Sequence, residues 1–294
     1  MPEVLVISGK GGTGKTSLTA AFAHLATSKV VCDLDVDAPD LHLLLRPRPR
    51  RTEEFYSGNL AVIAPERCTA CGECAQRCRY GAVTEKGGVY AIDPVACEGC
   101  GVCVHFCPAQ AIDFPSRHCG QWHISDTRLG TLVHAQLFPG QENSGRLVAL
   151  LRQQARELAR VQGAELILSD GPPGIGCPVI SSLSGTDLAV AVTEPTLSGF
   201  HDLERVVELC RHFRVPAAVI INRFDLNQEH SQAIGRWCTD NGLTLLARLP
   251  HDPAFVQAMV QQETITEYEQ SPLTDEIGRA WSGITALAGL PKAA

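Results

Sequence analysis

The residues of this sequence best suited to chemistry lie near its start, in the segment Gly9-Lys10-Gly11-Gly12-Thr13-Gly14-Lys15-Thr16. Its pattern, a glycine and four free positions followed by Gly-Lys-Thr, is that of a loop that binds phosphate groups. The glycines let backbone N–H groups curve around phosphate oxygens, because no Cβ obstructs that path. Lys15 is expected to contact the β- and γ-phosphates, and the Thr16 hydroxyl to bind Mg²⁺. We therefore predict that ATP and Mg²⁺ bind along Gly9 to Ser17.

The elements around this loop are those that a phosphate site requires. The apolar run from Val4 to Ser8 predicts a buried strand, and residues Ser17 to Ala26 predict a helix. The N-terminus of that helix would add partial positive charge beside the phosphates. A chance glycine turn is the alternative, and the order of strand, loop and helix disfavours it.

Two later strands are expected to end in carboxylates. The run Val30 to Asp35 ends in two aspartates, and the run Glu165 to Asp170 ends in one, followed by Gly-Pro-Pro-Gly. The carboxyl ends of parallel strands form the edge at which doubly wound sheets bind ligands. Asp170 is therefore predicted to hold Mg²⁺, usually through water. For the first pair, a turn rich in aspartate is the alternative.

Lys10 is not needed by an ordinary phosphate loop, and with it the segment Lys10–Thr16 resembles the deviant loop of the MinD/Mrp/ParA group of ATPases, which includes the nitrogenase iron protein. The resemblance implies that Lys10 reaches across a dimer interface to the partner's nucleotide. It also implies that Asp35 positions or activates the attacking water and that Asp33 supports the magnesium shell. Asn222, at the end of another strand, matches the position that contacts adenine in the group, with a simple turn cap as the alternative.

Eight of the thirteen cysteines form two runs with the spacing C-x2-C-x2-C-x3-C. The duplicated run is the signature of two-cluster bacterial ferredoxins, in which the fourth cysteine of each run serves the other cluster. Structural zinc is the alternative, but it favours two paired C-x2-C units. Arg79 stands where ferredoxins usually have the proline that Pro108 supplies in the second run. We therefore predict two [4Fe-4S] clusters, the first held by Cys68, Cys71, Cys74 and Cys107 and the second by Cys97, Cys100, Cys103 and Cys78.

The other five cysteines are scattered along the chain. Cys32, Cys210 and Cys238 lie in apolar strand or helix patterns and are expected in the core. Cys119 and Cys177 are open to two interpretations, as small packing residues or as single ligands facing a symmetry mate, and packing is favoured for both.

Composition bounds the function further. The 294 residues are 45 % hydrophobic and carry a formal net charge of -7, which gives no support to a nucleic-acid partner. No stretch approaches the roughly 20 apolar residues of a membrane span, and the N-terminus is not a signal peptide, so we expect a cytoplasmic protein without stable membrane insertion. The basic run Arg46 to Arg51 is expected to be an extended, exposed connection. From Thr274 onward we expect a helix that packs on the domain.

Strands and helices alternate on both sides of the cysteine-rich segment, and this predicts an α/β fold with a doubly wound, mostly parallel sheet. Residues 1–59 and 116–294 are assigned to a MinD-type ATPase domain, and residues 60–115 to an inserted ferredoxin-like α+β domain. A short strand is expected over Gly87 to Ile92, a hairpin around Asp126 to Leu129, and an amphipathic helix over Arg146 to Val161. Further buried strands are predicted at Asp187–Thr193, Pro216–Asn222 and Leu245–Pro250.

The combined resemblance is to MinD-superfamily ATPases with an inserted ferredoxin domain. It implies an ATPase that couples its nucleotide state to electron transfer through two clusters, working as an ATP-dependent homodimer or as a heterodimer with a related ATPase. A carrier that assembles and hands over iron-sulfur clusters, as Mrp-type proteins do, is the second hypothesis. A positioning or cell-division switch with structural or sensory clusters is the third. The sequence does not identify the protein that exchanges electrons with the clusters.

Overall fold

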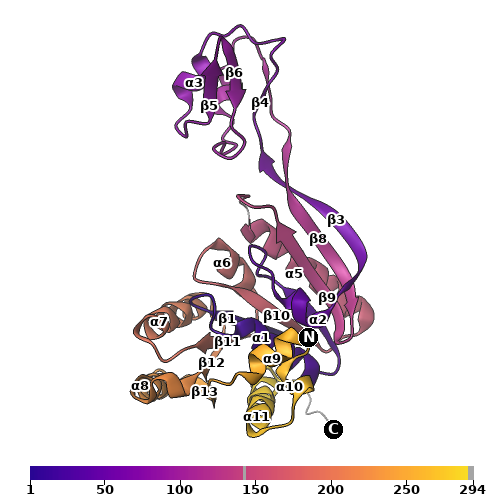
Figure 1. Ribbon diagram of the computed structural model, residues 1–294, viewed down its shortest axis with the longest axis vertical. Helices are drawn as coiled ribbons and strands as arrows, with labels where there is room; N and C mark the ends of the chain where they lie inside the picture. The colour runs from indigo at the N-terminus through magenta and orange to yellow at the C-terminus, as the bar shows by residue number, and fades with distance from the viewer. Residues whose placement is uncertain (142–143, 291–294) are drawn as a thin grey trace. The chain divides into compact units, whose positions relative to one another are not determined.

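The computed structural model, which describes residues 1–141 and 144–290, contains two compact units (Figure 1). The first unit comprises Met1–Glu53, Gln121–Gln136 and the chain from Ser144 onward, and the second comprises Glu54–Gly120 and the segment that begins at Leu137. The chain passes from one unit to the other within two long strands, β3 (Arg48–Asn59) and β8 (Ser116–Thr127).

A nine-stranded sheet forms the centre of the first unit, in the order β13-β12-β11-β1-β10-β2-β9-β8-β3 among the described residues. Every neighbouring pair from β13 to β9 is parallel, which confirms the predicted α/β fold with a mostly parallel sheet. Its other strands are β1 (Glu3–Ser8), β2 (Lys29–Asp33), β9 (Gly130–Leu137), β10 (Leu166–Pro173), β11 (Leu188–Thr193), β12 (Ala217–Asn222) and β13 (Thr244–Leu249).

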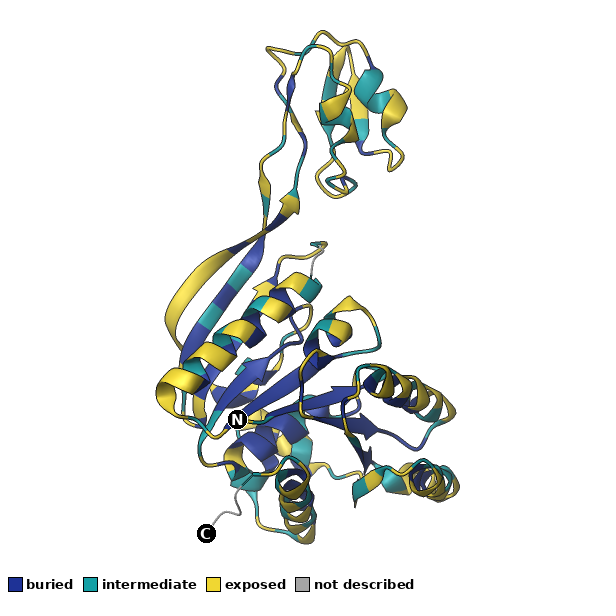
Figure 2. Ribbon diagram, turned by 180° about the vertical axis from the view of Figure 1, so that it is seen from behind, coloured by how far each residue is buried: buried dark blue, intermediate teal, exposed yellow. Residues whose placement is uncertain are grey.

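Helices cover both faces of this sheet (Figure 1). They are α1 (Lys15–Leu25), α2 (Leu41–Leu45), α5 (Ser144–Gln162), α6 (Cys177–Leu183), α7 (Leu197–His212), α8 (Gln228–Asp240), α9 (Ala254–Val260), α10 (Ile265–Tyr268) and α11 (Pro272–Leu287), with a 3-10 turn η1 (Phe224–Leu226). Because strand side chains alternate between faces, Val4 and Val6 join the core beneath α1 and α11. Helices α5, α6 and α7 contact β2, β10 and β11 on the opposite face. The central strands are buried throughout, whereas the helices expose their outer sides (Figure 2).

The last helix packs on the first unit, as predicted. Helix α11 begins with a capping box, in which the Ser271 hydroxyl accepts from the backbone N–H of Thr274 and the Thr274 side chain accepts from the N–H of Ser271. Ile277, Trp281 and Ile284 are buried, and the Trp281 ring stacks on Phe22 with centroids 5.5 Å apart. Within the described ranges, no helix combines the length and apolar character that crossing a membrane requires.

The second unit is small and is built from a repeat. It holds two antiparallel pairs of short strands, β4 (Val62–Ile63) with β7 (Ile112–Asp113) and β5 (Val83–Lys86) with β6 (Val89–Ile92), and two short helices, α3 (Glu73–Arg77) and α4 (Val102–His105). The two cysteine runs are separated by 29 residues, as from 68 to 97 and from 78 to 107. Left-handed backbone recurs at the same separation, in the pairs Ala70/Gly99, Gly72/Gly101 and Gly81/Gln110.

Three local predictions need correction. The run Arg46 to Arg51 is largely exposed, but Arg46 has left-handed backbone with a φ of 50°, and from Arg48 the chain is already the edge strand β3 instead of a free connection. Gly87 and Gly88 do not begin a strand, because their φ angles of 61° and 81° place them in the turn of the β5–β6 hairpin. Strand β2 stops at Asp33, two residues before the predicted end.

Candidate functional site

The phosphate-type loop joins β1 to α1 at the carboxyl edge of the sheet, and two of its glycines have no room for a side chain. A Cβ on Gly14 would lie 2.5 Å from Nδ2 of Asn222, and Gly14 has a φ of 91°. A Cβ on Gly9 would lie 2.4 Å from the Cβ of Asp202. Both positions therefore require glycine, for close approach at Gly9 and also for backbone conformation at Gly14.

Lys15 lies buried inside this loop, with its ammonium 3.0 Å from Oδ2 of Asp35. Burial by itself would lower the pKa of Lys15, but the nearby carboxylates of Asp170 and Asp35 outweigh burial and raise it. The lysine is therefore held in its charged form, which is the form that phosphate oxygens bind.

Thr16 and Asp170, both predicted around Mg²⁺, are brought together from distant parts of the chain. The Thr16 hydroxyl donates to Oδ2 of Asp170 at 2.6 Å, and the Thr19 hydroxyl donates to Oδ1 at 3.0 Å. Burial raises the pKa of Asp170, while Lys15 and the two hydroxyls oppose that rise. The sequence prediction did not include Thr19. Its place three residues after Thr16 on the same helix is the signal that identifies it.

Asp33 lies beside Asp170 in the sheet, because the two are register partners of the parallel pair β2–β10. Its Oδ1 accepts the backbone N–H of Asp35 at 3.1 Å, and its Oδ2 accepts that of Leu41 at 3.3 Å. Burial and the neighbouring Asp170 raise the pKa of Asp33 well above its ordinary value. In this structure Asp33 shapes the segment that carries Asp35, and its support of the magnesium shell stays a prediction.

Asn222 holds the loop in place. Its Nδ2 donates to the carbonyl of Thr13 at 2.8 Å, and its Oδ1 accepts the backbone N–H of Arg223 at 3.0 Å. The sequence had suggested adenine contact, which stays a prediction. The bond to Thr13 could not be foreseen because it joins residues 209 positions apart.

Lys10 points to the end of β11 in its own chain. Its Nζ lies 3.3 Å from Oε2 of Glu194 and 3.5 Å from the hydroxyl oxygens of Thr196 and Ser198. Glu194 was not among the predicted site residues. The rule that selected the aspartates, an acid directly after a buried parallel strand, would also have selected it.

The eight cysteines of the two runs line two separate cavities. The first is lined by Cys68, Cys71, Cys74 and Cys107. The second is lined by Cys97, Cys100, Cys103 and Cys78. Each cavity thus receives three cysteines from one run and the fourth from the other, which is the grouping expected from the sequence.

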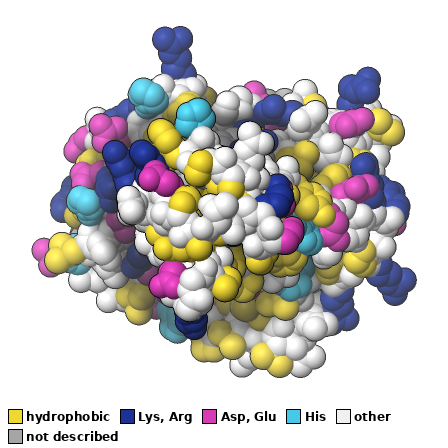
Figure 3. Space-filling model, turned by 90° about the horizontal axis from the view of Figure 1, so that it is seen from above, with side chains coloured by type: hydrophobic (Ala, Val, Ile, Leu, Met, Phe, Trp, Pro, Cys, Tyr) yellow, Lys and Arg dark blue, Asp and Glu magenta, His cyan; other side chains and the backbone are white. Residues whose placement is uncertain are grey.

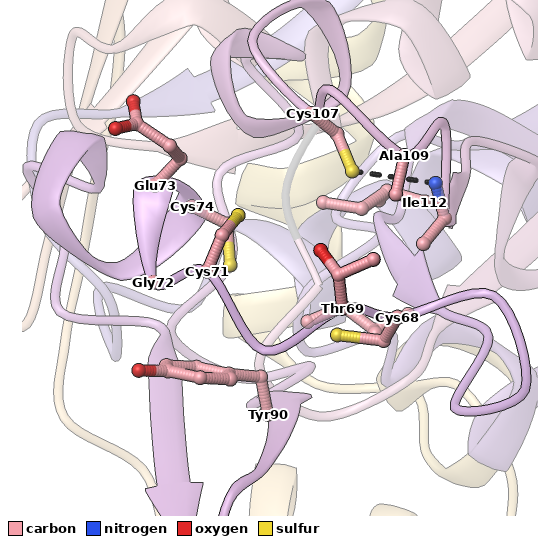
Figure 4. A pocket seen from close by; sticks show the side chains of 12 residues that line it. Cys68, Thr69, Cys71, Gly72, Glu73, Cys74, Tyr90, Cys107, Ala109 and Ile112 are labelled. Carbon is pink, nitrogen blue, oxygen red and sulfur yellow. Dashed lines mark hydrogen bonds between the residues drawn. The ribbon is translucent and has the colours of Figure 1, made fainter.

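Figure 4 shows the first cavity, with Cys68, Cys71 and Cys74 from one segment, Cys107 from another and Tyr90 beside them. The Sγ of Cys107 accepts the backbone N–H of Ala111 at 3.3 Å. Across residues 1–141 and 144–290, no three His, Cys, Asp or Glu side chains are grouped so as to hold a single metal ion. The four cysteines are brought together as the lining of one cavity.

The remaining five cysteines differ in how far they are buried. Cys32, Cys210 and Cys238 are buried, as predicted, and burial raises the pKa of Cys210 to about 12 and that of Cys238 to about 11. Cys119 is also buried, and its thiol donates to the carbonyl of Ser57 at 3.2 Å, so it packs within the second unit. Cys177 is exposed at the first residue of α6.

Comparison with known proteins places this geometry in a family. Residues 4–265 match the family described as the CobQ/CobB/MinD/ParA nucleotide binding domain. The chain belongs to this family. A relative from Methanocaldococcus jannaschii, the uncharacterized protein MJ0578, is 33 % identical over 229 residues, which are 76 % of this chain and 79 % of that one. The chain is therefore a MinD/ParA-type nucleotide-binding protein, and nucleotide binding at Gly9–Thr16 stays a prediction.

Two solved structures share the fold. The septum site-determining protein MinD of Pyrococcus horikoshii, complexed with Mg-ADP, superposes with a TM-score of 0.58 at 16 % identity, covering 98 % of this chain and 97 % of that chain. MinD in the MinC:MinD complex of Aquifex aeolicus gives a TM-score of 0.55 at 18 % identity, covering 100 % and 99 % of the two chains. At these identities the likeness shows the fold alone.

Proposed function

We propose that this protein is a Mg²⁺-dependent ATPase that couples its nucleotide state and dimerization to electron transfer through two [4Fe-4S] clusters. The nucleotide half of the proposal rests on the family and on the contacts of Lys15 with Asp35 and of Thr16 with Asp170. Lys15, Asp35 and Asp170 are buried. Lys15 would bind phosphate oxygens, and Thr16 with Asp170 would hold Mg²⁺ as their hydroxyl–carboxylate pair opens. Asp35, 3.0 Å from the Lys15 ammonium, would orient the attacking water.

The observation that carries the redox half is the crossed arrangement of eight cysteines around two cavities. Four thiols per cavity are the donor set of a [4Fe-4S] cluster, and the exchange of the fourth cysteine is the ferredoxin pattern. Zinc would need four thiolates about 2.3 Å from one ion, and the described side chains are not grouped in that way. A cubane has four irons and takes one thiolate on each, so it suits cysteines that surround a space. When bound, the clusters supply one-electron chemistry.

In this proposal residues 60–115 are the ferredoxin module and residues 1–59 and 116–294 are the ATPase domain. The compact second unit of the structure is somewhat wider than the module, because it includes the chain from Glu54 and the segment that begins at Leu137. Some of the extra residues belong to the ends of β3 and β8, which connect the module to the ATPase sheet, and the others begin at the last residue of β9.

We further propose that ATP favours a dimer, either of two copies of this chain or with a related ATPase, and that Lys10 contacts the partner's nucleotide. Lys15 and the backbone amides already serve the phosphates of its own loop, so a second cation there has no needed role within one chain. A nucleic-acid partner is not part of the proposal. The net charge is -7, and on the face shown in Figure 3 basic and acidic side chains are interspersed.

The test is an anaerobic preparation analysed for iron, visible absorption and EPR, followed by redox titration with and without a non-hydrolysable ATP analogue. We expect about eight irons per chain, and a reduction potential or reduction rate that changes with nucleotide in at least one cluster. Stoichiometric zinc without iron-sulfur absorption would refute the redox half. Identical redox behaviour in every nucleotide state, together with transfer of clusters to an apo-acceptor, would favour the cluster-carrier hypothesis instead.

Light scattering with the same analogue tests the dimer. We expect the wild-type chain to dimerize and Lys10→Ala to remain monomeric while it still binds nucleotide. A wild-type chain that stays monomeric with the analogue would refute the cross-subunit role of Lys10.

A further inference from the structure

Glu194 occupies a position from which one carboxylate contacts two cations of the nucleotide site. It directly follows β11 and is buried, with a relative exposure of 7 %. Its Oε2 lies 3.3 Å from Nζ of Lys10, and its Oε1 pairs with Nη1 of Arg223. Arg223 in turn lies 3.4 Å from the carbonyl of Gly12. Glu194 thus connects the lysine at the start of the loop with the arginine that contacts its middle.

The contacts of Lys10 all lie within its own chain. Besides Glu194, the Nζ of Lys10 is 3.5 Å from the hydroxyls of Thr196 and Ser198, which flank the start of α7. A lysine ammonium has three donors, and three acceptors of this one region surround it. In this position Lys10 is directed toward α7 of its own subunit.

The second cation, Arg223, allows Lys10 to leave at low cost. A buried carboxylate that loses its only partner is strongly unfavourable. Glu194 keeps Arg223 when Lys10 moves away, so its charge remains compensated. The side chain of Lys10 is 32 % exposed, whereas that of Glu194 is 9 % exposed, so within this pair the lysine has more freedom to move. Arg223 is 37 % exposed, but it also contacts the carbonyl of Gly12, which gives it a second attachment.

We propose that Glu194 is a positioning residue that holds Lys10 within its own subunit in the open state and releases it when the nucleotide-bound dimer closes. The proposal rests on the cross-subunit role of Lys10 in the proposed function. Arg223 stays with Glu194 throughout and keeps the loop attached to the end of β11. Loss of the Glu194 charge should therefore free Lys10 and favour dimer closure.

The first experiment measures the position of Lys10 without any dimer. The nucleotide-free protein, at a concentration where it is monomeric, is treated briefly with an amine-acylating reagent, and modification of Lys10 is quantified by mass spectrometry against the exposed Lys86. We expect Glu194→Gln to increase Lys10 modification about threefold to tenfold, the factor that corresponds to the loss of one partly exposed ion pair. Glu194→Asp, which keeps the charge on a shorter stem, should give an intermediate value.

Two controls separate the contact from general loosening of the fold. Glu204→Gln makes the same chemical change at an exposed position of α7 and should leave Lys10 modification at the wild-type value. Arg223→Gln removes the other partner of Glu194 and should not raise Lys10 modification. Equal Lys10 modification in wild-type protein and Glu194→Gln overturns the proposal, whatever the dimer does.

The second experiment measures analogue-induced dimerization by sedimentation over a range of protein concentrations. We expect Glu194→Gln to lower the dimer Kd about threefold to tenfold. A raised Kd would overturn the proposal, because Glu194 would then support the closed state. If Lys10 modification rises but neither protein dimerizes, Glu194 does hold Lys10, and it is the cross-subunit role in the proposed function that fails.

Discussion

The nucleotide site and the cysteine cavities are held together in different ways. The nucleotide site stands on a sheet buried on both faces, and its charged groups have partners within the protein, as Lys15 has in Asp35 and Asp170 has in the Thr16 hydroxyl. The core cluster around the cysteines of the second unit is small and consists of Ala61, Ala82, Cys97 and Ile112, with four more of the eight cysteines partly buried against them. The first site is formed by the protein itself, whereas in the proposed function the second depends on the clusters that its cysteines would bind.

The largest effect should follow from removing iron. Oxidation in the presence of a chelator should abolish the ordered structure of the second unit, because its apolar core is too small to fold alone and metal binding supplies folding energy. The first unit should keep its fold. Hydrogen exchange followed by mass spectrometry measures both, and we expect full exchange over residues 60–115 with unchanged protection in β1 and β11. Protection that persists in the second unit without iron would show that this unit, like the first, folds without metal.

Within the nucleotide site, Asp35→Ala should lower kcat for ATP hydrolysis about 10²- to 10⁴-fold, the usual contribution of a residue that positions or activates the nucleophile. Nucleotide affinity should not fall, because the substitution removes a carboxylate that competes with phosphate for Lys15. Steady-state hydrolysis and equilibrium titration give the two values. Hydrolysis at the wild-type rate would show that Asp35 does not position or activate the attacking water.

Lys15→Ala should weaken ATP binding about 100-fold, because it removes a buried cation from a site that already contains three carboxylates. Isothermal titration measures the affinity. Lys29→Ala is the matched control, since Lys29 is a half-buried lysine of the same sheet whose Nζ donates to the carbonyl of Ala26. A similar loss of affinity in both variants would point to general destabilization of the first unit.

The two regions also differ in how much of each the sequence alone predicted. The loop Gly9–Thr16 and the two cysteine runs are local patterns, in which the spacing itself carries the geometry, and the structure places their residues together. The contact of Glu194 with Lys10 and the hydrogen bond from Asn222 to Thr13 form because strands that are distant in sequence end side by side. Local spacing cannot express such contacts, although the sheet rule would have selected Glu194.

The strands that join the two units were also harder to foresee. Strand β3 begins with Arg48-Pro49-Arg50-Arg51, which lacks apolar alternation because it is the exposed edge of the sheet. Polar residues and proline are common on edge strands, where they prevent pairing with other chains. Taken alone, this polar, proline-containing segment therefore indicates a loop, but it forms an edge strand because β8 lies beside it.

The smallest expected effect is a change in the stability of the first unit at acidic pH. Glu267 of α10 pairs with Arg128 in the β8–β9 turn, and Arg128 also donates to the carbonyl of Leu44. Burial alone would raise the pKa of Glu267, but bonds from Arg128 and Thr264 lower it to about 2 from its ordinary 4.5. A carboxyl with a lowered folded pKa stabilises the fold above its unfolded pKa and loses that contribution as pH falls from about 4.5 to 2.

Because the pair is partly exposed, Glu267→Gln should reduce the free energy of unfolding of the first unit by about 1 kcal/mol at pH 7, and by progressively less below pH 4.5. Urea denaturation at several pH values, followed by the fluorescence of Trp281, measures this difference, with Glu204→Gln at an exposed position of α7 as the matched control. Chelator at neutral pH should leave the same signal unchanged while it unfolds the second unit. A mutational cost that is independent of pH would show that Glu267 acts by packing and not by its charge, and fluorescence that changes with chelator would show that the two units do not unfold separately.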